Sequence, residues 1–257
     1  MNNIFNLTRF GRLLIKHTFE HYKSYLMSLA VLFGVMLLGG CFIVYMLDAP
    51  MTIGMQTALF TSILLLAGTI FTSTVFASLG DKKKAIVWLT LPASHFEKYL
   101  VLWLYSFLLL IIIFTGCFYT VLFFLTSIKH FPNEPTEILD LFDRYGGFQV
   151  FLLYAFLHAV AFYGAVRFET LHFIKTAFAF FIGITFLIII NHLIQYGIFG
   201  GGVLMNVPFG GAHFMENNQE RVINITFSQQ WRMLTLLGVM SGVFWIAAYF
   251  RLKEKQV

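Results

Sequence analysis

Six long stretches of this sequence contain no Asp, Glu, Lys or Arg, and they constrain the fold more than any other feature. A helix needs about 20 mostly apolar residues to cross a bilayer, because each residue rises only about 1.5 Å. All six stretches approach or exceed that length. The sequence therefore predicts an all-α polytopic membrane protein with a single transmembrane domain over residues 1–257. We expect its six transmembrane helices at about 24–47, 54–80, 99–128, 147–167, 173–198 and 231–250.

Composition excludes a soluble enzyme. Hydrophobic residues make up 59% of the chain and charged residues 11%, against roughly 45–50% and about 25% in soluble domains. The sequence contains no phosphate-binding Gly-x-x-x-x-Gly-Lys-Ser/Thr loop, no Gly-x-Ser-x-Gly turn and no His-Glu-x-x-His helix. His17 and His21 are four residues apart, but no third ligand is evident nearby. We therefore expect no catalytic activity from the chain alone, no bound cofactor and no metal site.

The distribution of Lys and Arg predicts the orientation. With a cytoplasmic N-terminus and six spans, 13 basic residues fall on the cytoplasmic side and 4 on the outer side. Cytoplasmic loops carry the excess of Lys and Arg in membrane proteins. We therefore expect both termini in the cytoplasm. The net charge of +5 then reflects membrane orientation and gives no reason to expect a nucleic-acid partner.

Residues 1–23 have the pattern of an amphipathic helix. Apolar residues recur there at helical spacing, and several basic residues lie away from that stripe. This predicts a helix that lies on the cytoplasmic surface of the membrane. The alternative is a direct cytoplasmic extension of the first span. The apolar positions are Ile4, Leu7, Phe10 and Leu14.

The cytoplasmic loop 81–98 between spans two and three combines charge with apolar residues. Three lysines open it, which suits anionic lipid headgroups, and an apolar run ends at Pro92, which stops a helix. Ser94 and Glu97 then have the spacing of a capping box, which would start the next helix. The sequence predicts a short cytoplasmic helix, a break, and a firmly started third span. The alternative is an ordinary basic turn with an interfacial Trp88.

Residues 91–98 read Leu-Pro-Ala-Ser-His-Phe-Glu-Lys, and with the six-span topology they resemble the permease subunits of ATP-binding-cassette (ABC) exporters of the second permease type. The resemblance implies that the loop is a coupling helix contacted by a separate soluble ATPase, which would carry ATP and Mg. It also implies a second permease copy or paralogue and a bacterial cytoplasmic (inner) membrane location. The implied docking residues are Lys84, Trp88, Leu89, Leu91, Pro92, Ser94, Glu97 and Lys98.

Alternatives to this interpretation are a stand-alone secondary carrier and a membrane scaffold subunit of another complex. The polar residues within the spans are candidates for a pore or for helix–helix hydrogen bonds. Residues 199–230 are rich in Gly and Asn, and we expect an extracytoplasmic loop or a re-entrant segment there. Small residues in spans one and five, Gly34, Gly39, Gly40 and Gly183, predict close helix packing. The span candidates are His158, Asn191 and His192.

Overall fold

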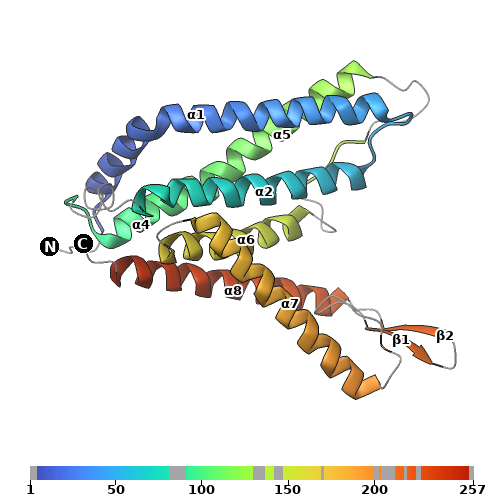
Figure 1. Ribbon diagram of the computed structural model, residues 1–257. Coiled ribbons are helices and arrows are strands. Elements are labelled where there is room, and N and C mark those ends of the chain that lie inside the picture. The colour runs from blue at the N-terminus through green and yellow to red at the C-terminus, as the bar shows by residue number, and fades with distance from the viewer. Residues whose placement is uncertain are drawn as a thin grey trace.

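A computed structural model describes most of the chain: residues 5–80, 91–129, 137–141, 147–168, 171–199, 203, 212–216, 219–223 and 227–254. Helices dominate these residues (Figure 1). The helices are α1 (Leu7–Met46), α2 (Ile53–Gly80), α4 (His95–Trp103), the π-helix η1 (Leu104–Leu109), α5 (Leu110–Ile128), α6 (Gly147–Arg167), α7 (His172–Phe199) and α8 (Phe227–Glu254). Two strands precede α8, namely β1 (Ala212–Glu216) and β2 (Gln219–Ile223).

Within the described residues, six helical segments are long and apolar enough to cross a membrane. Five of them are α1, α2, α6, α7 and α8, and the sixth is the continuous run of α4, η1 and α5 over His95–Ile128. The predicted number of apolar helices is therefore confirmed, as expected for a multi-pass membrane protein. Helix α1 begins and α8 ends at the same end of the bundle (Figure 1).

Helix α1 is one uninterrupted helix of 40 residues. At about 1.5 Å per residue it is roughly twice as long as a single crossing needs. Its first part turns toward α4, at an angle to the remainder (Figure 1). In this part Leu13 and His17 are buried, and Leu13 packs against Val101 and Tyr105. The N-terminal segment is thus continuous with the first span and packs against the beginning of the third.

The half of the bundle that lies away from the start of α1 has an aromatic core. Phe60 of α2 meets the rings of Phe114 and Phe118 of α5 edge-on, with centroids 5.2 and 5.0 Å apart. Such edge-to-face pairs add about 0.5–1.5 kcal/mol each beyond the area that they bury. The many Phe residues of the chain therefore do more than face lipid, because part of them hold α2 against α5.

Glycines allow neighbouring helices to approach closely at three points. A Cβ atom on Gly40 would lie 2.4 Å from the side chain of Leu125, and one on Gly68 would lie 2.3 Å from that of Tyr154. Gly164 likewise faces Thr176 of α7. Close packing was predicted at Gly40 and not at the other two. At three further predicted positions an added Cβ would meet nothing within 4 Å in the described chain, namely Gly34, Gly39 and Gly183.

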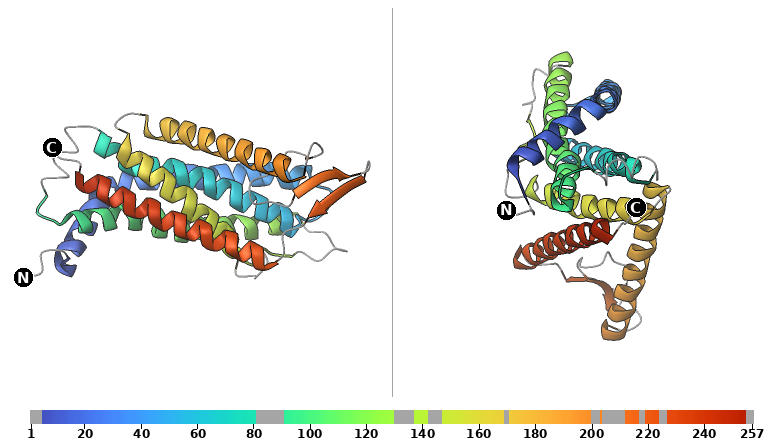
Figure 2. Two further views of the ribbon diagram at one scale, coloured as in Figure 1. Left: turned by 90° about the horizontal axis from the view of Figure 1, so that it is seen from below. Right: turned by 90° about the vertical axis from the view of Figure 1, so that its left-hand side faces the viewer.

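Strands β1 and β2 form an antiparallel hairpin in the segment 199–230, with Ala212 opposite Ile223 and Glu216 opposite Gln219. The hairpin lies at the end of the bundle opposite to the beginning of α1 (Figure 2). The all-α prediction did not include it. Neither strand alternates clearly between apolar and polar residues, so the sequence carries no period-two signal for them.

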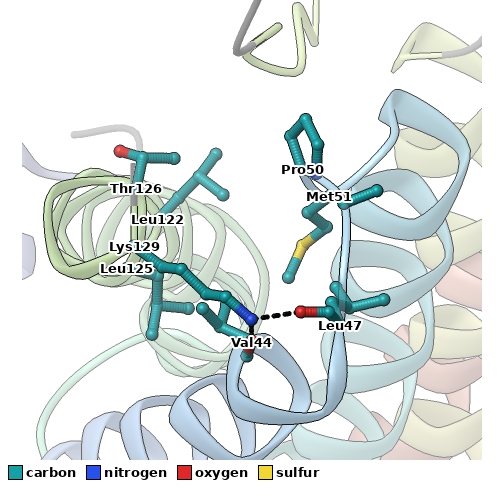
Figure 3. A pocket seen from close by; sticks show the side chains of 9 residues that line it. Val44, Leu47, Pro50, Met51, Leu122, Leu125, Thr126 and Lys129 are labelled. Atoms are coloured by element: carbon teal, nitrogen blue, oxygen red, sulfur yellow. Dashed lines mark hydrogen bonds between the residues drawn. The ribbon is translucent and has the colours of Figure 1, made fainter. Parts of the chain in front are cut away.

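Lys129, directly after α5, stabilises the end of α1. Its ammonium group donates hydrogen bonds to the backbone carbonyls of Val44, at 3.3 Å, and Leu47 (Figure 3). These carbonyls lie at the C-terminus of α1, where the helix dipole favours a positive charge. One of the four basic residues on the predicted outer side therefore has a local structural role.

Candidate functional site

Helix α4 begins with the predicted capping box. The backbone N–H of Glu97 donates to the Ser94 hydroxyl oxygen at 3.1 Å, and the N–H of Ser94 donates to the Glu97 carboxylate at 2.8 Å. Both bonds satisfy N–H groups that the first turn of a helix leaves free. Residues 91–93, which include Pro92, form a bend just before it. The bend and the firm helix start that the sequence predicted are confirmed, whereas the short cytoplasmic helix predicted before them lies outside the described residues.

The same carboxylate also binds the start of α1. The Glu97 Oε1 atom accepts from the backbone N–H of Asn6 at 2.7 Å and from the guanidinium of Arg9 at 3.2 Å. Asn6 in turn caps α1 through its side-chain oxygen, which accepts from Thr8 N–H at 2.9 Å. We call Asn6, Arg9, Ser94 and Glu97 the α1–α4 joint. Sequence analysis missed Asn6 and Arg9, because they lie 91 and 88 residues from Glu97.

Electrostatics favour a charged Glu97 at this position, which precedes the charge-free stretch of the third span that begins at Tyr99. The side chain is 0% exposed, yet it faces the positive N-terminal ends of two helices and one cation. Burial raises the pKa of the Glu97 carboxyl, but the N–H groups of Ser94 and Asn6 and the charge of Arg9 together lower it by more. The net pKa is below the ordinary value. The joint therefore depends on an ionised carboxylate that is hydrogen-bonded on both oxygens.

Apolar contacts surround the joint. Leu91 packs against the buried cluster of Leu13, Val101 and Tyr105. Phe96 lies edge-on to the rings of Phe5 and Tyr249, with centroids 6.2 and 6.1 Å away. Of the candidate docking residues, Leu91 thus has an internal packing role, and Lys98 is buried as well. Lys84, Trp88 and Leu89 lie outside the described residues.

A second polar cluster lies deeper, between α6, α8 and the π-helix η1. His158 is completely buried, and its Nε2 atom lies 2.9 Å from the Ser106 hydroxyl. The indole N–H of Trp245 donates to His158 Nδ1 at 3.1 Å, so that nitrogen carries no proton. A neutral His158 then carries its proton on Nε2, and this N–H donates a hydrogen bond to the Ser106 hydroxyl oxygen. The Ser106 hydroxyl donates in turn to the Leu102 carbonyl at 2.8 Å, which completes the chain.

The π-helix η1 also contacts α6 through Tyr154, one turn before His158. A π-helix shifts the backbone pairing by one residue, and such turns occur frequently at functional sites. Here the Tyr154 hydroxyl donates to the backbone carbonyl of Ser106 at 3.0 Å. The ring of Phe107 stacks on Tyr154, with centroids 5.7 Å apart. His158 therefore contributes to helix–helix contact, the second of the two roles that the sequence left open.

The other two candidates in the spans lie elsewhere. Asn191 and His192 are on α7, whose described residues are exposed or half-buried apart from Thr176. His158 bonds to Ser106 and Trp245 instead of either α7 residue. Figure 2 shows α7 standing away from the rest of the bundle at one end. The structure does not assemble the three polar residues into one site.

The described residues contain no group of three or more His, Cys, Asp or Glu side chains placed to hold a metal ion. Hydrogen bonds and one ion pair hold the joint, and hydrogen bonds alone hold the cluster around His158. A comparison of the chain with protein-family models, curated proteins and solved structures found no match in any of the three.

Proposed function

We propose that this chain is the membrane-spanning permease subunit of an ABC exporter, in which a separate ATPase drives substrate across the membrane. The α1–α4 joint is the observation that supports this proposal most. Its residues Ser94 and Glu97 lie at the end of the loop 81–98, which the resemblance assigns to ATPase contact. If ATPase movement is to reach the spans, the connection between the loop and the spans must be stiff. The buried Glu97 provides such a connection, because its two carboxylate oxygens are hydrogen-bonded to the starts of α4 and α1.

The joint would couple two spans to one movement. A partner that displaces the residues before Ser94 also displaces Glu97, because the capping box holds them together. Glu97 is bonded to the first turn of α1, so α1 and α4 would move as a unit. Helix α4 continues through η1 into α5, which carries the movement toward the outer half of the bundle. A second copy or paralogue would complete the transport pathway.

The test is purification of the tagged chain in mild detergent, with identification of each stoichiometric partner. We expect one soluble ATPase per permease. Trp88→Ala should reduce the ATPase recovered, because an apolar residue of the docking loop would be lost. Trp231→Ala is the matched control: it removes a half-exposed tryptophan at the opposite end of the bundle and should leave recovery unchanged.

Leu91→Asp is a poor probe of docking, because Leu91 packs inside the chain and its loss would disturb the joint as well. Leu89→Asp is the better second variant. A wild-type chain that purifies with no ATPase, or a Trp88→Ala chain that keeps its full complement, would contradict the proposal. Those results would favour a stand-alone carrier or a scaffold.

A further inference from the structure

A cavity of about 510 Å³ lies between α1, α2 and the continuous helix η1–α5. Its volume falls in the range of about 300–1,000 Å³ that is typical of small-molecule sites. Figure 1 shows α1 and α2 running roughly parallel, with α5 crossing behind them. Met27 and Val31 of α1 and Leu66 of α2 border the cavity and are more than half exposed. The cavity therefore opens onto the surface that the six apolar helices present to lipid.

The cavity has the depth of one leaflet. Along α1 it extends from Tyr25 to Val35, and ten residues of helix rise about 15 Å. Half of a hydrocarbon core of about 30 Å is the same length. Beyond Val35 the groove is closed, because Met36 is buried in the aromatic core and Gly40 packs against Leu125. The space ends near the middle of the membrane.

Its polar groups gather at one end. Most of the lining is apolar, but Tyr25, Ser28 and Thr74 line the end nearest the start of α1 and the end of α2. Lys23 lies four residues before Met27, and Ser24 four before Ser28, so both continue the lining stripes of α1 by one turn. Lys23 is exposed, and the ion pairs of the described residues do not include it.

We propose that this cavity binds an acyl chain of an anionic phospholipid from the leaflet on the side of the α1–α4 joint. The apolar groove holds the chain, the hydroxyls of Ser24 and Ser28 meet the glycerol and ester region, and the Lys23 ammonium pairs with the phosphate. The distribution of Lys and Arg predicts that this leaflet is the cytoplasmic one. The occupied groove would fill the space between α1 and α2 and so stiffen the segment that leads to the joint.

The one-leaflet depth favours a lipid over a helix of a second copy. A helix that crosses the membrane would need an apolar groove through both leaflets, whereas this one closes beyond Val35. The basic end also matches a phosphate and not the apolar flank of another span. The proposal requires membrane insertion only, and it holds whether or not an ATPase binds.

The experiment is native mass spectrometry of the delipidated full chain, back-titrated with phosphatidylglycerol or with phosphatidylcholine of the same acyl chains. Ala67→Phe fills the cavity from α2, and Leu66→Trp blocks its rim as a second filling variant. Ala58→Phe is the control, because Ala58 is an exposed residue of the same helix outside the cavity. Lys23→Gln tests the headgroup contact, with Lys253→Gln as an exposed control at the same end of the bundle.

We expect one tightly held phosphatidylglycerol per wild-type chain, lost in Ala67→Phe or Leu66→Trp and kept in Ala58→Phe. Lys23→Gln should retain lipid but lose about fivefold of its preference for phosphatidylglycerol, the factor that one lysine contributes near an anionic surface. Equal lipid binding by the wild type and both filling variants would overturn the proposal. So would filling variants that keep lipid but change a dimer into a monomer, because the occupant would then be a second copy.

Discussion

The α1–α4 joint and the cluster around His158, both on the third span, use different kinds of polar group. The α1–α4 joint, at the start of α4, uses an ionised carboxylate, a guanidinium and three backbone N–H groups. The cluster around His158 meets the third span at Ser106, about two and a half turns after Glu97, and uses neutral donors and acceptors only. Each cluster holds the continuous helix α4–η1–α5 against helices that are far away in the sequence. Only the joint contains charged side chains, and it lies just before the charge-free stretch of the third span.

The cost of desolvation accounts for this difference. A charge in the hydrocarbon region is expensive, whereas a neutral group is tolerated when every donor finds an acceptor. At the joint, Arg9 remains 37% exposed and keeps part of its contact with solvent or headgroups. Around His158, the chain from Trp245 to Leu102 leaves neither ring nitrogen unpaired. The joint should therefore respond to loss of charge, and the deeper cluster to loss of a single hydrogen bond.

The largest effect is expected from Glu97→Ala. It removes the acceptor for Asn6, Ser94 and Arg9 and leaves the guanidinium beside a buried apolar surface. Because Arg9 is partly exposed, we expect the low end of the range for breaking a buried pair, a loss of about 3 kcal/mol in the free energy of unfolding. Unfolding in mixed detergent micelles measures it. Glu254→Ala removes an exposed carboxylate paired with Arg251 and should change stability by less than about 0.5 kcal/mol. Equal losses of stability in Glu97→Ala and Glu254→Ala would show that the buried carboxylate of the joint stabilises the fold no more than an exposed one.

His158→Phe should have the next largest effect. Phenylalanine fills much of the volume but leaves the Ser106 hydroxyl and the Trp245 indole N–H without their partner. Hydrogen bonds between membrane helices are worth about 1–2 kcal/mol in model peptides, and we expect a loss of that size. His192→Phe is the control, because the His192 Nδ1 atom has no hydrogen-bond partner in the described part of the chain. If His192→Phe destabilises as much, the deeper cluster has no special role.

Ser94→Ala should have a smaller and more local effect. It removes one cap of α4 while Glu97 keeps its bonds to Asn6 and Arg9, so the joint should loosen without opening. Loss of an N-cap costs about 1 kcal/mol. Amide hydrogen exchange should accelerate at Phe96 and Glu97, whose N–H groups lie in the first turn. Ser127→Ala, which removes only a bond to the carbonyl four residues earlier, should leave that exchange unchanged.

Acidification should produce the smallest effect at the joint. The folded state holds the Glu97 pKa below its unfolded value of about 4.3, so its contribution is present above that pH and is lost as the pH falls through the folded pKa. Stability should therefore decline in acid more steeply in the wild type than in Glu97→Gln. Parallel curves for the wild type and Glu97→Gln would show that the charge of Glu97 is not what holds the joint.

The two clusters also differ in how far the sequence predicted them. Ser94 and Glu97 are three residues apart, and a capping box is a local arrangement that needs no knowledge of the fold. The partners of His158 are 52 and 87 residues away from it, and those of Glu97 on α1 are 88 and 91 residues away. A single sequence contains no signal that links positions at such distances. His158 could be marked as polar within a span, but its partners could not.

The sequence by itself determined the six apolar helices, the bend at Pro92 and the start of α4, because bilayer thickness and helix capping act on contiguous residues. The tertiary structure alone decided which glycines face a neighbour, that Leu91 packs inward and that Asn6 and Arg9 complete the joint. It also decided that α1, α2 and α5 border a cavity toward one end of the bundle and that α1 closes on α5 toward the other end. In a membrane every span has an apolar surface, so hydropathy does not specify the neighbours of a helix. Shape and a few buried polar groups specify them, and these act between residues that only folding brings together.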